Sequence, residues 1–325
     1  MEIRKLGWTE LKFTTIGLGT WAMGGGGWKF SWGPQEDWES VAAIHRGLDS
    51  GINWIDTAAV YGLGHSEEVV ARALAETDHQ PWVATKCGRV WDRMGNITGN
   101  ISRESVKKEA ENSLRRLRRE TIDLYQIHWP LPEECIEEAW AAMGELVQEG
   151  KVRYAGVSNF NLEQLKRIHP IHPVASLQPP YSMLERSIEG DLLRYCARNQ
   201  IGLVVYSPMA KGLLTGKMTR ERVAGFALDD HRRNDPRFGD PQLSIHLELV
   251  EDLRRLAETH QRTISQLVIA WVLRCPEITS AIVGTRSAAQ IEETVGAGDR
   301  PLSAEESEAI DKLLADHREK IRAAK

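Results

Sequence analysis

The sequence predicts an α/β protein in which parallel strands close into a (β/α)8 barrel, formed as a single domain over residues 1–325. Short apolar runs alternate with helix-like segments along nearly the whole chain, and repeated βα units with short links produce a parallel sheet. Eight such units are recognisable, and eight is the number that closes a barrel of roughly 250 residues. The doubly wound two-domain alternative would begin with a GxGxxG motif, which this chain lacks.

The first four βα units occupy the first half of the chain. Each predicted strand is a short apolar run bounded by turn residues, which is typical of strands buried on both faces. These strands cover residues 13–20, 52–57, 81–86 and 123–129. The helices that follow them cover residues 37–50, a segment from about residue 66, and residues 102–117 and 134–148. In the first helix, Val41, Ile44 and Leu48 recur at the spacing of one helical face.

Capping residues mark several of these helix ends. Ser66 is a candidate N-cap, because Glu67 and Glu68 follow it in the first turn, where carboxylates interact favourably with the helix dipole. Ser102 is the predicted N-cap of the third helix, although it lacks a full capping box. Gly150 is predicted to end the fourth helix.

The second half of the chain continues the alternation. Its predicted strands cover residues 152–158, 175–182, 202–208 and 280–285. Its predicted helices cover residues 162–168, residues 191–198 and a segment from about residue 288. Residues 209–243 are rich in Arg, Asp and Gly and are predicted to form a long loop. Residues 301–325 are predicted to form an extra terminal helix, because Ser303 and Glu306 have the spacing of a capping box.

The composition argues against several classes of partner. The net charge of −5 arises from 41 basic and 46 acidic residues, a balance that does not indicate a nucleic-acid or membrane-surface partner. The four cysteines are widely spaced and form no CxxC motif, which favours free thiols in a reducing cytosol. The charged N-terminus and the lack of any long apolar run indicate neither a signal peptide nor a membrane span. We therefore expect a cytoplasmic protein.

Four residues that suit proton transfer lie at or just beyond the ends of predicted strands two to four. They are Asp56, Tyr61, Lys86 and His128, and in a barrel the carboxyl ends of the strands meet on one face. A free phenol has a pKa of about 10, too high for efficient protonation of a carbonyl oxygen near neutrality. We expect the Lys86 ammonium to lower the pKa of Tyr61, with Asp56 holding Lys86 and His128 orienting the carbonyl group. The sequence thus predicts a site in which Tyr61 is the general acid.

Eight motifs occur in an order that resembles one known family over nearly the full chain. They are GLGTW at 17–21, IDTAAVYGLGHSEE at 55–68, ATK at 84–86, DLYQIHWP at 123–130, VRYAGVSNF at 152–160, LQPPYSM at 177–183, YSPMAKGLLTGK at 206–217 and IVGTRSAAQIEE at 282–293. The family is the aldo-keto reductases, and the chain is similar to bacterial members of the branch that includes potassium channel β subunits. The resemblance implies a TIM barrel without a Rossmann domain. It also implies reduction of aldehydes or ketones, or oxidation of the matching alcohols or aldoses, with Asp56, Tyr61, Lys86 and His128 as the catalytic set.

The resemblance further implies a binding site for a nicotinamide cofactor. The end of the first strand and the nicotinamide clamp correspond to Gly19, Thr20, Trp21, Asp56, Ser158, Asn159, Gln178 and Tyr206. The pyrophosphate loop corresponds to Ser207, Pro208, Met209, Ala210, Gly212, Leu213 and Lys217. The adenosine end corresponds to Gly284, Thr285, Arg286, Gln290 and Glu293. Thr294 departs from the family pattern, in which many relatives have asparagine.

Arg286 bears on the choice of cofactor. A guanidinium group can bind a 2′-phosphate through two parallel hydrogen bonds, so the resemblance implies NADP(H), with NAD(H) accepted at lower preference. The alternative is a solvated arginine at the start of a helix. Arg222, Arg232 and Arg233, in the unmatched segment 218–243, are further candidates for a cofactor contact.

Aromatic residues in the strand-end loops suggest the substrate pocket. The predicted pocket residues are Trp21, Tyr61, Trp91, His128 and Trp129. Flat aromatic walls suit aryl groups or the apolar faces of sugars, so we expect a small-molecule carbonyl or sugar substrate. Trp28 and Trp32 either extend this wall or pack loops over the barrel mouth, and the glycine run at 24–27 suggests a flexible loop. No metal site is expected, because the histidine pair of the HPIHP segment lacks Cys or carboxylate partners.

A rival function has the same fold and cofactor site. Redox-sensing regulatory subunits, such as the potassium channel β subunits, resemble this chain, but the position matching His128 is altered in that group. The histidine here favours an enzyme. The physiological substrate, the direction of the reaction and the choice between monomer and homo-oligomer do not follow from the sequence.

Overall fold

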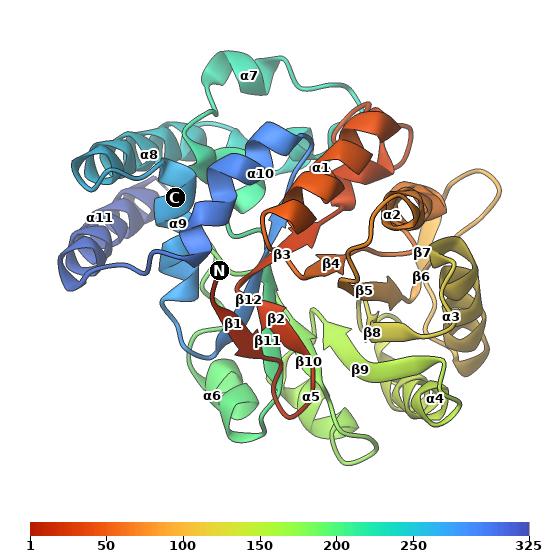
Figure 1. The fold of residues 1–325 in the computed structure, drawn as a ribbon. Helices are drawn as coiled ribbons and strands as arrows, with labels where there is room; N and C mark the ends of the chain where they lie inside the picture. Colours follow the sequence, from red (N-terminus) through yellow and green to blue (C-terminus); the bar gives the residue numbers. More distant parts are fainter. Residues whose placement is uncertain (325) are drawn as a thin grey trace.

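The computed structural model describes residues 1–324, and within this range eight parallel strands form one closed barrel enclosed by helices (Figure 1). The predicted fold class is confirmed. Neighbouring strands follow the order of the chain, and the last strand pairs with the first. The strands are β3 (Ile16–Gly19), β4 (Trp54–Asp56), β5 (Trp82–Cys87), β8 (Ile122–Ile127), β9 (Val152–Ser158), β10 (Ser176–Gln178), β11 (Gly202–Tyr206) and β12 (Ile278–Gly284).

A helix follows each strand, as the alternating pattern predicts. These helices are α1 (Asp37–Asp49), α2 (His65–Ala75), α3 (Arg103–Leu117), α4 (Ile136–Gln148), α5 (Leu162–Ile168), α6 (Asp191–Arg198), α9 (Ile264–Leu273) and α10 (Ala288–Val295). Two predicted helices, 162–168 and 191–198, have the bounds expected from the sequence. The sequence prediction does not contain α9, because almost all of its residues are apolar and buried and it shows no polar face.

The predicted first strand, 13–20, is divided in the structure. Its first part is β2 (Lys12–Thr14), which pairs antiparallel with β1 (Ile3–Lys5), and only β3 joins the barrel. The ring of Phe13 stacks on Trp54, with 4.4 Å between centroids, and Leu6 packs so closely that a Cβ added to Gly202 would lie 2.4 Å from it. The hairpin therefore closes the amino-terminal end of the barrel, which a continuous strand could not do.

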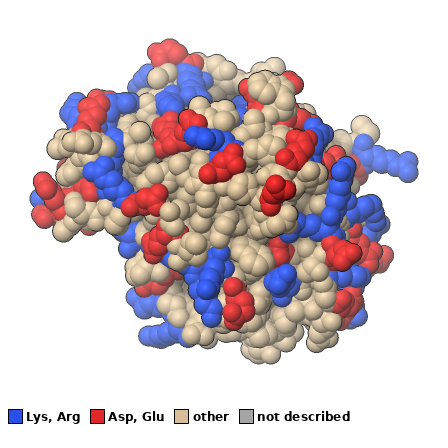
Figure 2. Space-filling model, in the orientation of Figure 1, with Lys and Arg blue, Asp and Glu red and all other residues tan. Residues whose placement is uncertain are grey.

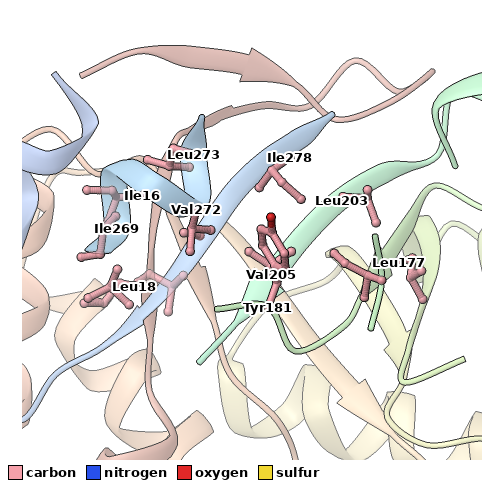
Figure 3. Packing of buried hydrophobic residues seen from close by; sticks show 14 of the residues in the cluster. Ile16, Leu18, Leu177, Tyr181, Leu203, Val205, Ile269, Val272, Leu273 and Ile278 are labelled. Carbon is pink, nitrogen blue, oxygen red and sulfur yellow. The ribbon is translucent and has the colours of Figure 1, made fainter. Parts of the chain in front are cut away.

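Apolar residues fill both faces of the strands. Figure 3 shows Leu177, Leu203 and Ile278, from β10, β11 and β12, among the buried residues that pack between the strands and the outer helices. On α9, Ile269 and Val272 belong to the same cluster. This double burial explains why the strands appear in the sequence as nearly continuous apolar runs.

The capping predictions have mixed outcomes. Ser303 begins α11 (Ala304–Ala323) with a full capping box, and Ser102 caps α3, as predicted. Ser66 does not cap α2, since it lies inside the helix and Gly64 is the N-cap. The Ser66 hydroxyl is buried against the strand ends instead, 2.8 Å from the Thr20 hydroxyl.

The segment predicted as a long loop, 209–243, contains several short helices. It includes 3-10 turns at Ala210–Thr215, His231–Asn234 and Pro236–Phe238, together with α7 (Arg220–Ala224). It is followed by α8 (Gln242–Thr259), which packs beside α11 outside the barrel (Figure 1). A second hairpin, β6 (Arg89–Trp91) with β7 (Ile97–Gly99), lies between β5 and α3. The sequence prediction contains neither α8 nor this hairpin.

Charged groups of both signs are interspersed over the face drawn in Figure 2. In the described part of the chain, charged side chains also form pairs between neighbouring helices, such as Lys107 with Glu145 and Arg167 with Glu137. Within residues 1–324, no helix has the length and apolar character needed to cross a membrane.

Candidate active site

The carboxyl ends of the barrel strands bring the predicted catalytic residues together. Asp56 is the last residue of β4, Lys86 is the second-last residue of β5, and His128 directly follows β8. Backbone pairing sets their relative heights, because Asp56 is in register with Gly19 and Ala84, while Lys86 is in register with Gln126. Such convergence is a property of parallel barrels.

Lys86 is the centre of the hydrogen-bond network. Its ammonium group donates to the Asp56 carboxylate at 2.7 Å, to the Thr57 carbonyl at 2.9 Å and to the Tyr61 hydroxyl at 3.3 Å. Asp56 and Lys86 are only 3% and 1% exposed. The His128 ring meets the Tyr61 ring edge-on, with 5.7 Å between centroids. A phenol, a cation and an imidazole therefore border the same point at the base of the site.

A tight backbone contact positions Tyr61. The turn after it has Gly62 at φ 60° and Leu63 at φ 56°, both in the left-handed region. A Cβ on Gly24 would lie 2.5 Å from the Gly62 nitrogen, so the two backbones meet where no side chain fits. The first glycine of the run at 24–27 thus serves close packing, whereas the sequence suggests only a flexible loop.

The residues of the predicted nicotinamide clamp hold one another and the catalytic groups. Gln178 donates to the second oxygen of Asp56 at 2.8 Å. Asn159 donates to the backbone carbonyl of His128 at 2.9 Å and accepts from the Tyr206 hydroxyl at 2.8 Å. These side chains are held by hydrogen bonds to neighbouring protein groups, and such preorganisation is favourable for orienting a ring.

Burial controls the ionisation of the site. The pKa of Tyr61 is raised well above 10.0, first by burial and then by the negative charge of Asp56. The expectation that Lys86 lowers this pKa is therefore wrong for this structure, because loss of hydration outweighs the ammonium. Burial, with the positive charges of Lys86 and Arg89, lowers the pKa of His128 well below 6.5. At neutral pH, Tyr61 is protonated and His128 is neutral.

Above these groups lies a cavity of about 650 Å³. Most residues predicted for the site line it: Gly19, Thr20, Trp21, Asp56, Tyr61, His128, Trp129, Ser158, Asn159, Gln178, Tyr206, Ser207, Pro208, Met209, Gly212, Lys217, Gly284, Thr285, Arg286, Gln290 and Glu293. Lys86 lies behind Tyr61, while Ala210 and Leu213 are buried beneath the loop.

Trp91 does not reach the cavity, in contrast to its predicted place in the substrate pocket. Its ring packs against the guanidinium of Arg116 on α3, 5.9 Å from the ring centroid. Arg89, two residues earlier on the same short strand, lines the cavity instead. The hairpin that selects between these two residues is not evident in the sequence.

Aromatic rings form one wall of the cavity. Trp21 stacks on Tyr61 at 5.7 Å and on His231 at 5.3 Å between centroids. Trp28 and Trp32 both line the cavity, so of the two alternatives left open by the sequence they extend the aromatic wall. His231 comes from the segment 218–243, where no sequence motif marks it as a site residue. Only its stacking on Trp21 and its place in the cavity identify it.

The opposite side has the features of a site for a phosphorylated cofactor. Ser207, Ala210, Lys211 and Gly212 all have positive φ, in turns that can direct backbone N–H groups toward an anion. Gly284 leaves open space, with nothing within 4 Å of an added Cβ. These residues, with the basic side chains that line the same cavity, fit a nicotinamide dinucleotide.

Arg286 has protein partners in the structure. Its guanidinium donates to the Gln35 side chain at 2.7 Å, to the Trp32 carbonyl at 3.2 Å and, by a very short contact, to the Pro34 carbonyl. Arg222 also lines the cavity and makes one contact, to the Lys217 carbonyl at 3.2 Å. Of the two, Arg222 has more donors free for a phosphate.

Comparisons with known proteins agree with this architecture. Residues 15–315 match the model of the Aldo/keto reductase family. Aldo-keto reductase YhdN of Bacillus subtilis (strain 168) is 38% identical over 317 residues, covering 97% of this chain and 94% of the relative. The NADH-specific methylglyoxal reductase of Escherichia coli (strain K12) is 35% identical over 328 residues, covering 94% and 98%. The structure of the glycerol dehydrogenase AKR11B4 from Gluconobacter oxydans has a TM-score of 0.88 at 39% identity, covering 97% and 95%.

Proposed function

Since the chain belongs to the aldo/keto reductase family of NAD(P)H-dependent oxidoreductases, which act on carbonyl and alcohol groups, we propose that it reduces small aldehydes or ketones with Tyr61 as the general acid. The observation that carries the proposal is the Lys86 ammonium, 3.3 Å from the Tyr61 hydroxyl and 2.7 Å from Asp56. We also propose that residues 1–325 form one reductase domain.

The chemistry of the chain's own groups follows from their contacts. When bound, the nicotinamide supplies the hydride. Tyr61 gives its proton to the carbonyl oxygen, and the adjacent Lys86 ammonium stabilises the phenolate that remains. Asp56 keeps Lys86 in place and compensates its buried charge. A neutral His128 donates one hydrogen bond to the same oxygen, and in alcohol oxidation the Tyr61 phenolate accepts the proton.

The binding roles follow the same geometry. Ser158, Asn159 and Gln178 would hold the carboxamide of the nicotinamide, and Tyr206 would stack on its ring. The hydrogen bonds of the Asn159 amide with Ser158 and Tyr206, and of the Gln178 amide with Asp56, support this role, because they keep the amide groups in fixed orientations. The wall formed by Trp21, Trp28 and Trp129 would enclose the apolar part of the substrate.

We further propose that NADPH is preferred over NADH. Arg222 and Arg286 both line the cavity. Either guanidinium can bind a 2′-phosphate, and loss of one charge-assisted hydrogen bond should weaken binding by about tenfold or more. The NADH-specific relative makes the opposite preference the alternative to be tested.

Tryptophan fluorescence, quenched by cofactor, measures this preference. We expect the wild type to bind NADPH more tightly, and Arg222→Ala or Arg286→Ala to raise the dissociation constant of NADPH more than that of NADH. If Arg286→Ala weakens the binding of both cofactors equally, Arg286 stabilises residues 32–35, which it contacts in the structure, and does not bind the 2′-phosphate. Tighter binding of NADH by the wild type would overturn the cofactor proposal.

The activity is tested by cofactor consumption with 4-nitrobenzaldehyde, methylglyoxal, pyridoxal and free aldoses, and by glycerol oxidation in the reverse direction. NADPH and NADH are supplied in parallel, with Tyr61→Phe as the inactive control. Turnover that is unchanged in Tyr61→Phe would remove the general-acid assignment. Cofactor binding without turnover of any carbonyl would favour the regulatory-subunit alternative.

A further inference from the structure

Arg89 is a charged residue in the cavity that the proposed mechanism does not use. It follows Lys86 by three residues, begins β6 and lines the cavity together with His128 and Trp129. Its guanidinium makes no hydrogen bond or ion pair with any other side chain or carbonyl in residues 1–324. The side chain is partly buried, and burial lowers its pKa.

Several other basic residues around the cavity differ from Arg89 because they have carboxylate partners, while Arg222 and Arg286 bind oxygens of neutral groups. Arg232 pairs with Asp230 at 2.6 Å, and Lys211 pairs with Asp235 at 3.0 Å. Lys217 forms an ion pair with Glu293. A cation removed from water without a partner is costly. An unpaired guanidinium in a binding cavity therefore indicates that the missing anion belongs to a ligand.

The position of Arg89 separates it from the proposed cofactor side. It follows β5, next to β8, whereas the residues proposed to hold phosphates follow β11 and β12 across the barrel. Arg89 and His128 line the same cavity, so the guanidinium lies on the side of the proposed reacting end of the substrate. A ligand anion at Arg89 would thus belong to the carbonyl substrate.

The backbone that carries Arg89 is held firmly. The Gly88 N–H group donates to both oxygens of the Glu109 carboxylate, at 3.2 and 3.0 Å. Arg89 itself pairs with Gly99 across the hairpin. A group presented from a fixed strand end is more selective than one on a loose loop.

We propose that Arg89 determines specificity by binding an anionic group, carboxylate or phosphate, of the carbonyl substrate. The preferred substrates are then aldehydes or ketones in which an apolar segment, lying against the tryptophan wall, separates the carbonyl from the anion. The proposal rests on the proposed reductase activity and adds the substrate class.

Matched substrates test the proposal. The acid 4-carboxybenzaldehyde and its neutral methyl ester share one reacting aldehyde, so their kcat/KM ratio isolates the anion. We expect the wild type to favour the acid by about tenfold or more, and Arg89→Leu to abolish the preference by raising KM for the acid. Arg89→Lys should retain part of it, because a point charge replaces the planar fork. Comparing 4-formylphenyl phosphate with the neutral 4-methoxybenzaldehyde shows whether phosphate is the better anion.

Arg93→Leu is the matched control, because Arg93 is an exposed residue on the same hairpin and should leave the ratio unchanged. A wild type with no preference for either anionic substrate, or a preference that survives Arg89→Leu, overturns the proposal and leaves the reductase activity standing. Failure to turn over any of these aldehydes contradicts the reductase proposal instead. In that case, ligand binding tests the role of Arg89. The anion site is supported if benzoate quenches tryptophan fluorescence, benzyl alcohol does not, and the quenching by benzoate is lost in Arg89→Leu. Equal quenching by benzoate in the wild type and in Arg89→Leu overturns the proposal.

Discussion

The two sides of the barrel mouth hold their charges in different ways. On the side of β4 and β5, Asp56 and Lys86 form a buried pair with further buried hydrogen bonds to Gln178 and Thr57. On the side of β11 and β12, Lys217 is more than half exposed in its pair with Glu293, and Arg222 is exposed. Removing one partner of a buried ion pair strongly destabilises the folded protein, whereas an exposed ion pair contributes only about 0–1 kcal/mol to the free energy of unfolding.

This difference assigns separate tasks to the two sides. On the side of β4 and β5, where we propose proton transfer, the hydrogen bonds of Lys86 hold the groups at fixed distances. The side of β11 and β12 carries the exposed pair of Lys217 with Glu293 and part-buried contacts between residues 27–35 and 226–235, such as Ser31 with Asp229. Separating the exposed pair costs little, so Lys217 is available to a ligand. Substitutions on the first side should therefore change kcat and stability, and those on the second should change cofactor affinity.

The largest expected effect is on the proton donor. Tyr61→Phe should lower kcat by ~10²–10⁴-fold, since it removes a general acid and keeps the aromatic contacts with Trp21. Cofactor dissociation constants, measured by tryptophan quenching, should hardly change. A kcat close to that of the wild type would show that the side of β4 and β5 does not supply the proton.

The second effect is on the buried ion pair. Lys86→Met should lower the free energy of unfolding by about 3–5 kcal/mol, because the carboxylate of Asp56 is left uncompensated, and it should also reduce kcat. Urea denaturation measures the loss. The double variant with Asp56→Asn should recover much of the stability and none of the activity. If the double variant does not recover stability, the loss in Lys86→Met is due to changed packing and not to the uncompensated charge of Asp56.

A third effect concerns Glu109, whose pKa burial raises from 4.5 to about 7. A raised pKa in the folded state means that this carboxyl stabilises the fold below pH 4.5 and that the contribution is lost as the pH rises through about 7. Glu109→Gln should therefore be more stable than the wild type by up to about 3 kcal/mol near pH 8, with little difference near pH 4. The same difference at both pH values would contradict the assigned titration.

A smaller effect is expected on the cofactor side. Lys217→Met removes the exposed pair with Glu293 and should leave kcat and unfolding free energy nearly unchanged. The dissociation constant of NADPH should rise by about threefold to tenfold, and more at low ionic strength, as expected for a surface charge. Loss of kcat comparable to that in Tyr61→Phe would remove the distinction between the two sides.

The smallest effect should be that of pH on the reductive half-reaction. Because burial raises the pKa of Tyr61 well above 10.0, the phenol keeps its proton through the neutral range and the donor is not depleted as the pH rises. Single-turnover reduction should thus hardly change between about pH 6 and about pH 9. A decline centred near neutrality would mean that the ammonium of Lys86 outweighs burial when the cofactor is present.

Much of this architecture follows from local properties of the chain. Apolar runs bounded by turn residues predict the barrel strands, because a strand buried on both faces has few polar positions. The N-cap of α3 and the capping box of α11 depend on residues three apart, and the structure has them at Ser102 and Ser303. The meeting of Asp56, Lys86 and His128 follows from strand order alone, since the carboxyl ends of parallel strands share one face.

Other features depend on contacts between distant segments, which no local pattern contains. Whether Arg89 or Trp91 faces the cavity is decided by a hairpin and by Arg116 on α3. The sign of the Tyr61 pKa shift depends on burial beneath loops, whereas the sequence indicates only that Lys86 is near. Arg286 is bound to Gln35, from the far end of the chain. Desolvation and side-chain direction are set by everything that surrounds a residue, so only the tertiary structure decides them.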